Sequence, residues 1–140
     1  MSDRCSVTLT MRKRDLPKAD RALGWPPDAL ARRIQDDDGQ VVGLYEDETS
    51  YGWLDVRKTL AKAGIAFVGS HGSGAEYMGC KFAAHGGKME EVNVAENGDL
   101  VVTVDVNRKG RIVPRRMEMK AIRQYLRLRR RAEKEFGYEK

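Results

Sequence analysis

The chain is 140 residues long, with 41% hydrophobic and 34% charged residues and a mean hydropathy of −0.61. A chain of this length suits one domain and buries roughly 70% of its unfolded surface, so we expect a compact core without disulfides or a structural metal. Its apolar runs are far shorter than the roughly 20 residues of a membrane-spanning helix, and its N-terminus lacks a signal-peptide core. We therefore expect a cytoplasmic protein without a membrane partner.

The net charge of +5 hides three blocks of different sign. Residues 1–34 carry 8 basic and 4 acidic groups, residues 35–106 carry 5 and 13, and residues 107–140 carry 13 and 4. The blocks thus have net charges of +4, −8 and +9. An acidic middle is flanked by basic ends, and the C-terminal quarter is the most strongly charged part of the chain.

The first half of the chain predicts strands interleaved with helices. Polar and apolar residues alternate over 5–11, which is typical of a half-buried strand. Pro17 after Asp15 indicates a helix start, and Gly24 indicates its end. In chain order the expected elements are a strand over 5–11, helices over 15–24 and 29–34, a turn over 36–39, a strand over 40–45, an acidic loop over 46–51 and a helix over 53–63.

The second half predicts further strands and one long helix. Asn97-Gly98 is the strongest hairpin signal in the chain. The expected strands cover 65–68, 76–84, 89–94 and 100–106, with a glycine-rich turn over 69–74 and tight turns at 86–87 and 97–99.

The pattern over residues 116–136 predicts an amphipathic helix. At 100° per residue, one sector of roughly 140° collects apolar residues. These are Met117, Ala121, Ile122, Tyr125, Leu128, Ala132 and Phe136. The opposite sector, roughly 100° wide, is cationic: Lys120, Arg123, Arg127, Arg130, Arg131 and Lys134. Arg129 falls in the apolar sector, where we expect it to reach solvent or find a partner.

These elements predict an α+β fold in a single domain over 1–140. An antiparallel sheet of about five to six strands would carry two to three helices on one face. The specific expectation is a ferredoxin-like β-α-β start with added strands. Residues 1–106 would form the sheet and its helices, and the basic helix over 116–136 would pack on them.

The six cations of the final helix are the candidate binding site. Arginine donates hydrogen bonds in a fork that matches phosphate oxygens, so such a face can bind nucleic acid. The aromatic residue Tyr125 lies on the apolar side and offers no platform for stacking bases. An acidic surface of a host protein, the acidic middle of another copy, or solvent alone fits the same pattern.

The glycine-rich turn over 69–76 is a weaker candidate. Glycines let a backbone approach an anion, but the turn lacks the Gly-Lys-Ser/Thr ending of a P-loop, and flexible hairpin turns use the same residues. His71, Glu76, Cys80 and His85 are metal ligands by type, yet their spacing matches no zinc pattern. The sequence therefore predicts no metal, no cofactor and no catalytic residue. Cys5 and Cys80 are expected to be free and buried.

An acidic set surrounds the strand expected over 40–45. It consists of Asp36, Asp37, Asp38, Glu46, Asp47 and Glu48. The set lacks the spacing of a calcium-binding loop. It predicts solubilising loops, and mimicry of a nucleic-acid backbone is the alternative.

Three short segments carry a resemblance. Tyr51-Gly52-Trp53, the residues Leu-Ala-Lys-Ala-Gly-Ile-Ala-Phe over 60–67, and the residues His-Gly-Ser-Gly-Ala-Glu-Tyr over 71–77 resemble small uncharacterised accessory proteins of bacteriophages and plasmids. The resemblance covers about 51–77. It implies a mobile-element protein made inside a bacterial cell, and it transfers no catalytic residue.

The resulting functional hypothesis is a non-enzymatic binding module of a phage or mobile element. It would engage nucleic acid or an acidic host protein through the cationic helix face. The alternatives are a small enzyme centred on 69–76, with His71, Glu76 and His85 as acid–base groups, and a salt-sensitive self-associating structural protein.

Overall fold

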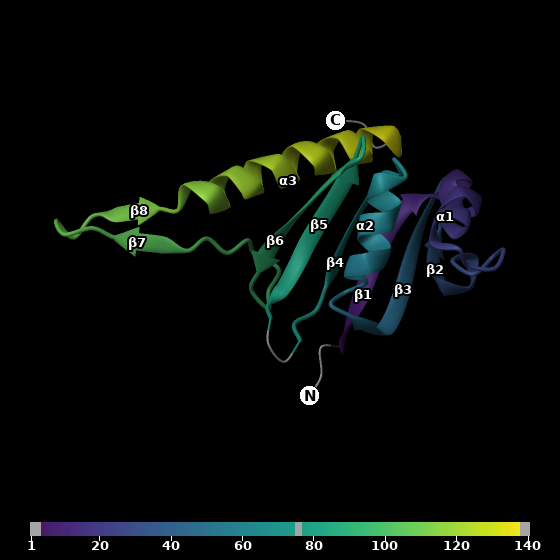
Figure 1. Ribbon diagram of the computed structural model, residues 1–140, viewed down its shortest axis with the longest axis horizontal. Helices are drawn as coiled ribbons and strands as arrows, with labels where there is room; N and C mark the ends of the chain where they lie inside the picture. The colour runs from purple at the N-terminus through teal and green to yellow at the C-terminus, as the bar shows by residue number, and fades with distance from the viewer. Residues whose placement is uncertain (1–3, 75–76, 138–140) are drawn as a thin grey trace.

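The computed structural model describes residues 4–74 and 77–137, and this part of the chain forms one antiparallel sheet, a separate hairpin and three α-helices (Figure 1). The sheet has six strands in the order β2-β3-β1-β4-β5-β6. Its strands are β1 (Arg4–Arg12), β2 (Ile34–Asp37), β3 (Val41–Ser50), β4 (Phe67–His71), β5 (Gly79–His85) and β6 (Lys88–Val94). The predicted α+β fold class and the predicted strand number are confirmed.

Strand β1 lies near the middle of the sheet, and its alternating side chains bury one face of the strand in the core. Val7, Leu9 and Met11 point into the core and are at most 1% exposed, as the period-two pattern predicts. Helix α1 (Leu16–Leu23) follows and ends at Gly24, whose φ of 70° is a left-handed conformation that glycine adopts without strain. Strand β1 then pairs with β3 on one side and β4 on the other.

The first six sheet and helix elements run β1-α1-β2-β3-α2-β4, where α2 is Leu54–Lys62. Their four strands lie in the order β2-β3-β1-β4, all antiparallel. A β-α-β-β-α-β unit with split βαβ crossovers is the arrangement called ferredoxin-like, so the topology is compatible with the expected start. Strands β5 and β6 extend the sheet beyond β4 as a meander.

The helices cover both faces of the sheet. Helices α1 and α2 contribute Leu16 and Leu60 to the main core, together with Leu9, Phe67 and Phe82 of the sheet. Helix α3 (Arg116–Glu135) packs against Val68 and Ala83. These residues directly follow Phe67 and Phe82 in their strands, and successive strand residues point to opposite faces, so α3 covers the other face of the sheet. Two helices thus share one face, as expected, and the long C-terminal helix takes the other.

Three expectations for the first half are wrong. The residues expected to be an acidic loop over 46–51 continue β3 as far as Ser50, because they pair with the start of β1 and Thr49 Oγ1 donates to Cys5 O at 2.8 Å. The expected turn at 36–39 overlaps β2, which pairs with β3. The helix expected over 29–34 is only a 3₁₀ turn, Ala31–Arg33.

The strand expected over 100–106 is also wrong for most of its length. Leu100 makes one bridge to Val94, and only β7 (Val104–Val106) is a strand. It pairs with β8 (Ile112–Pro114) around a turn that Asn107 Oδ1 braces by accepting from two backbone amides. Residues 104–106 thus pair with β8, which is close in sequence, instead of extending the sheet at β6. The β7–β8 hairpin, residues 104–114, projects away from the sheet beyond the first turn of α3, and we call it the arm (Figure 1).

Helix α3 matches its predicted bounds, but its first turns extend past the sheet. Met117, expected on the buried side, is 75% exposed for this reason. Across the described ranges, no helix combines the length and apolar character needed to cross a bilayer.

Candidate functional site

The apolar stripe of α3 fixes the helix on the sheet. Tyr125, Leu128, Ala132 and Phe136 are at most 3% exposed and pack against strands β3 to β6 and the segment before β4. Their i, i+3, i+4 spacing puts them on one side of the helix. The opposite side of α3 must therefore face solvent.

All six cations of the predicted site are exposed on that side: Lys120, Arg123, Arg127, Arg130, Arg131 and Lys134. From Lys120 to Lys134 the face is about 21 Å long, at 1.5 Å per residue. Within the described ranges, none of the six takes part in an ion pair. The six cations thus share one exposed face of α3.

The glutamates of the described part of α3 are engaged elsewhere. Glu118 accepts a hydrogen bond from the Thr103 amide, and Glu135 pairs with Arg12 at 3.1 Å and lies 3.0 Å from His85. Glu133 pairs with Arg129 at 3.2 Å, and the Arg129 side chain is 44% exposed. Arg129 therefore has both of the expected solutions, a partner and access to solvent.

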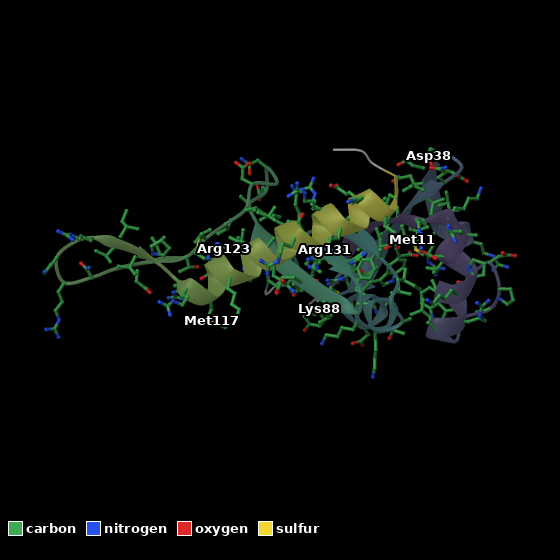
Figure 2. All side chains as sticks on the ribbon, turned by 90° about the horizontal axis from the view of Figure 1, so that it is seen from above. Met11, Asp38, Lys88, Met117, Arg123 and Arg131 are labelled. Atoms are coloured by element: carbon green, nitrogen blue, oxygen red, sulfur yellow. The ribbon has the colours of Figure 1, made fainter. Side chains whose placement is uncertain are left out.

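The arm carries further positive charge at its tip, beyond the first turn of α3 (Figure 1). Its turn carries Arg108, Lys109 and Arg111, which are exposed, and Arg115 pairs loosely with Asp105 at 3.4 Å. Seen from above, Arg123 and Arg131 lie along α3 and Met117 lies beside the arm (Figure 2). Exposed cations thus lie both along α3 and at the tip of the arm, and sequence reasoning missed those of the arm.

The acidic set lies at the other end of the molecule. Asp38 is far from Met117 and the arm (Figure 2). Hydrogen bonds from Lys13 and the Gly39 amide lower the pKa of Asp37, and amides of Val41 and Gln40 lower that of Asp38, so these exposed carboxylates stay charged in mild acid. The acidic set around β2 and β3 is therefore separated from the arm, whereas Asp105 of the same acidic block lies on the arm and pairs with Arg115.

The glycine-rich segment does not assemble the predicted acid–base groups. His71 ends β4 on the α2 side of the sheet, whereas the His85 ring contacts Glu135 of α3 on the opposite side. Glu76 lies outside the described residues. A hollow of about 580 Å³ does lie beside the segment. Its lining includes His71, Glu96 and Lys81 together with hydroxyl side chains, and His85 is not part of it.

A second cluster, not foreseen from the sequence, lies under the start of α2. Arg57 is 1% exposed, and its guanidinium donates to Gly52 O at 2.8 Å, to Tyr51 O at 3.1 Å and to Glu91 at 2.9 Å. The same group lies 4.2 Å from the centre of the Phe82 ring. A helix periodicity alone gives no sign that Arg57 is buried.

The segment before α2 has an unusual backbone. Tyr51, Gly52 and Trp53 have consecutive φ angles of 50°, 63° and 63°. Side chains other than glycine adopt this region at a cost, and such strain collects at functional sites. Gly52 is required, because a Cβ there would lie 2.4 Å from the His71 ring.

The segments that carry the resemblance meet at this cluster. The Tyr51 and Tyr77 rings lie 5.2 Å apart, and His71 lies 5.7 Å from the Tyr77 ring. Cys5 and Cys80 are free and buried, as expected. Burial lowers the pKa of His71 and raises that of Cys80 to about 11, so both groups are neutral near pH 7.

Comparison with known proteins gives no relative: neither a protein-family model, nor a curated protein, nor a solved structure matches the chain. Function must therefore be argued from the two sites themselves.

Proposed function

We propose that the chain is a non-enzymatic binding module that engages nucleic acid through the cationic face of α3. The observation that carries the proposal is the line of six exposed, unpaired cations, about 21 Å long, within the part of the chain that the structure describes. A merely solvated helix commonly pairs its cations with acids at i+4. Here Glu135, four residues after Arg131, pairs with Arg12 instead, and Glu133 pairs with Arg129, so none of the six outward cations of the described helix pairs with an acid.

The arm supports nucleic acid over an acidic protein as the partner. A two-stranded ribbon fits the major groove of duplex DNA, and the turn of this ribbon carries three cations, Arg108, Lys109 and Arg111. The helix face would contact phosphates, which gives affinity without sequence preference. The missing stacking platform argues against a dedicated single-strand binder.

The test compares two variants that remove the same charge. In the first, Arg123, Arg127 and Arg130 are all replaced by glutamine. In the control, Arg14, Lys18 and Arg21, exposed around α1, are replaced by glutamine. Anisotropy of a labelled DNA duplex is expected to show at least tenfold weaker binding for the first variant and little change for the control. Equal losses would reject a specific face and leave only net charge.

Copurification from a bacterial host, with and without nuclease, tests the partner class. Nucleic acid in the untreated sample supports the proposal. An acidic protein that stays bound after nuclease would replace it with the protein-partner alternative. The origin implied by the resemblance, a phage or plasmid accessory protein acting in a bacterial cell, belongs to the same proposal.

Self-association is the second candidate, and one observation favours it. The acidic set and the basic arm lie at opposite ends of the molecule (Figure 2). Contact between unlike ends of successive copies would generate open, head-to-tail chains. Sedimentation at low and high salt separates the candidates, because a monomer at both salt concentrations eliminates self-association.

A further inference from the structure

Three neighbouring strands place metal-binding side chains together on the α2 face of the sheet. His71 of β4 is directly opposite Cys80 of β5, and Cys80 is opposite Asn93 of β6. Glu91 lies two residues from Asn93, so it is the diagonal neighbour of Cys80 on the same face. The ligand atoms of His71, Cys80 and Glu91 all lie within 4.8 Å of one another.

A backbone hydrogen bond fixes the tautomer of the His71 ring. His71 Nδ1 lies 2.7 Å from Gly72 O, and because a carbonyl can only accept, Nδ1 carries the proton. The lone pair is therefore on Nε2. Metal-binding histidines typically donate their other N–H in this way. The Gly52 backbone also packs against the ring and restricts its rotation.

Glu91 is oriented by Arg57. Its Oε1 accepts from Arg57 Nη1 at 2.9 Å, which leaves its second oxygen for another partner. Carboxylate ligands are usually fixed by such hydrogen bonds. The Glu91 side chain is 40% exposed, so the cluster has a route to solvent, while His71 and Cys80 are each 7% exposed.

The donor set selects a class of metal. One thiolate, one imidazole and one carboxylate are the ligands that zinc takes in proteins, whereas magnesium and calcium take oxygen alone. Zinc binds sulfur at about 2.3 Å and nitrogen or oxygen at about 2.1 Å, so the ligand atoms of a tetrahedral site lie roughly 3.5 Å apart. The observed cluster needs a closure of about 1 Å, which is within reach of side-chain rotation.

We propose that His71, Cys80 and Glu91 form a three-ligand site for a divalent transition metal, with zinc preferred and a water molecule in the fourth position. Binding releases the Cys80 thiol proton to solvent, and the hydrogen bond from Sγ to Asn93 Oδ1 (3.3 Å) is given up. Of the four residues that the sequence offers as ligands by type, the proposed site uses His71 and Cys80, and its third ligand is Glu91. It is independent of the nucleic-acid proposal, because it lies on the face of the sheet opposite α3.

The test uses the full chain without a histidine tag. Titration with Co²⁺ is expected to produce a near-ultraviolet thiolate-to-cobalt band that saturates at one equivalent. Zn²⁺ is expected to abolish the band and to compete with a chromophoric chelator. The absence of a thiolate band at one equivalent would overturn the proposal.

Matched variants separate this site from adventitious binding. Cys80→Ser is expected to remove the band, and Glu91→Gln, at a more exposed position, to weaken Zn²⁺ binding about tenfold. Cys5→Ser is the control, because Cys5 Sγ lies 3.8 Å from His71 Nδ1, the nitrogen that is not proposed to bind the metal. A band that survives Cys80→Ser, or that disappears in Cys5→Ser with the fold intact by circular dichroism, would reject the assignment.

Discussion

Replacing Arg57 with methionine tests how the cluster under α2 is held together. The substitution keeps most of the apolar stem but removes three hydrogen bonds from a side chain that is 1% exposed. The carbonyls of Tyr51 and Gly52 would each lose a charged donor, at about 1.5 kcal/mol each. The pair with Glu91 adds less than about 1 kcal/mol, because that carboxylate is 40% exposed.

We therefore expect Arg57→Met to lower the free energy of unfolding by about 3 to 4 kcal/mol. For a chain of this size, the corresponding drop in Tm is on the order of 10 °C. Urea unfolding followed by tryptophan fluorescence measures the change, because Trp53 immediately precedes α2 and its ring lies 6.1 Å from that of Trp25. An m-value equal to that of the wild type would show that Arg57→Met exposes the same surface on unfolding, so that the change in midpoint reports stability alone.

Arg129→Met is the matched control. Arg129 also pairs with a glutamate, at 3.2 Å, but its side chain is 44% exposed. Exposed pairs contribute less than about 1 kcal/mol, so the control should lose little stability. Equal losses in the two variants would refute the reasoning that burial and the two backbone carbonyls make Arg57 important.

Further variants test packing at other positions. Gly52→Ala is expected to cost about 2 to 3 kcal/mol, because its Cβ would overlap the His71 ring, whereas Gly24→Ala, at a similar φ in open space, should cost about 1 kcal/mol in the same urea assay. Leu128→Ala should cost about 2 to 5 kcal/mol by loosening α3, against less than about 0.5 kcal/mol for the 47% exposed Leu126→Ala. Replacing the arm, 104–114, by a Gly-Ser linker should leave Tm unchanged by calorimetry and weaken DNA binding. A Tm drop in the arm variant, or equal costs within either pair, would contradict these assignments.

Elements with a clear period were predictable. The alternation over 5–11 and the amphipathic pattern over 116–136 each specify one buried side, and the structure buries that side over most of both segments. Met117 is an exception: the helical period predicts which side of α3 it lies on, but not that the sheet ends before this turn of the helix. The cationic face was predictable for the same reason as the apolar stripe.

Features that depend on pairing between distant segments were not predictable. The residues over 46–50 have a loop-like composition, yet they continue β3 because β1 lies beside them. The proximity of His71, Cys80 and Glu91 depends on the register of three strands, which the spacing in sequence does not reveal. In the sequence Arg57 cannot be distinguished from an exposed helix cation, because its burial depends on the carbonyls of Tyr51 and Gly52, which accept its hydrogen bonds in the structure.

The salt dependence of duplex DNA binding tests the central proposal most directly. If all six helix cations contact phosphates, the logarithm of the binding constant should fall with the logarithm of salt concentration at a slope of about −5. Removing the charges of Arg123, Arg127 and Arg130 should bring the slope to about −3, because three contacts are lost. The control variant of Arg14, Lys18 and Arg21 should keep the wild-type slope. Equal slopes for the wild type and both variants would contradict the proposal that the α3 face binds nucleic acid.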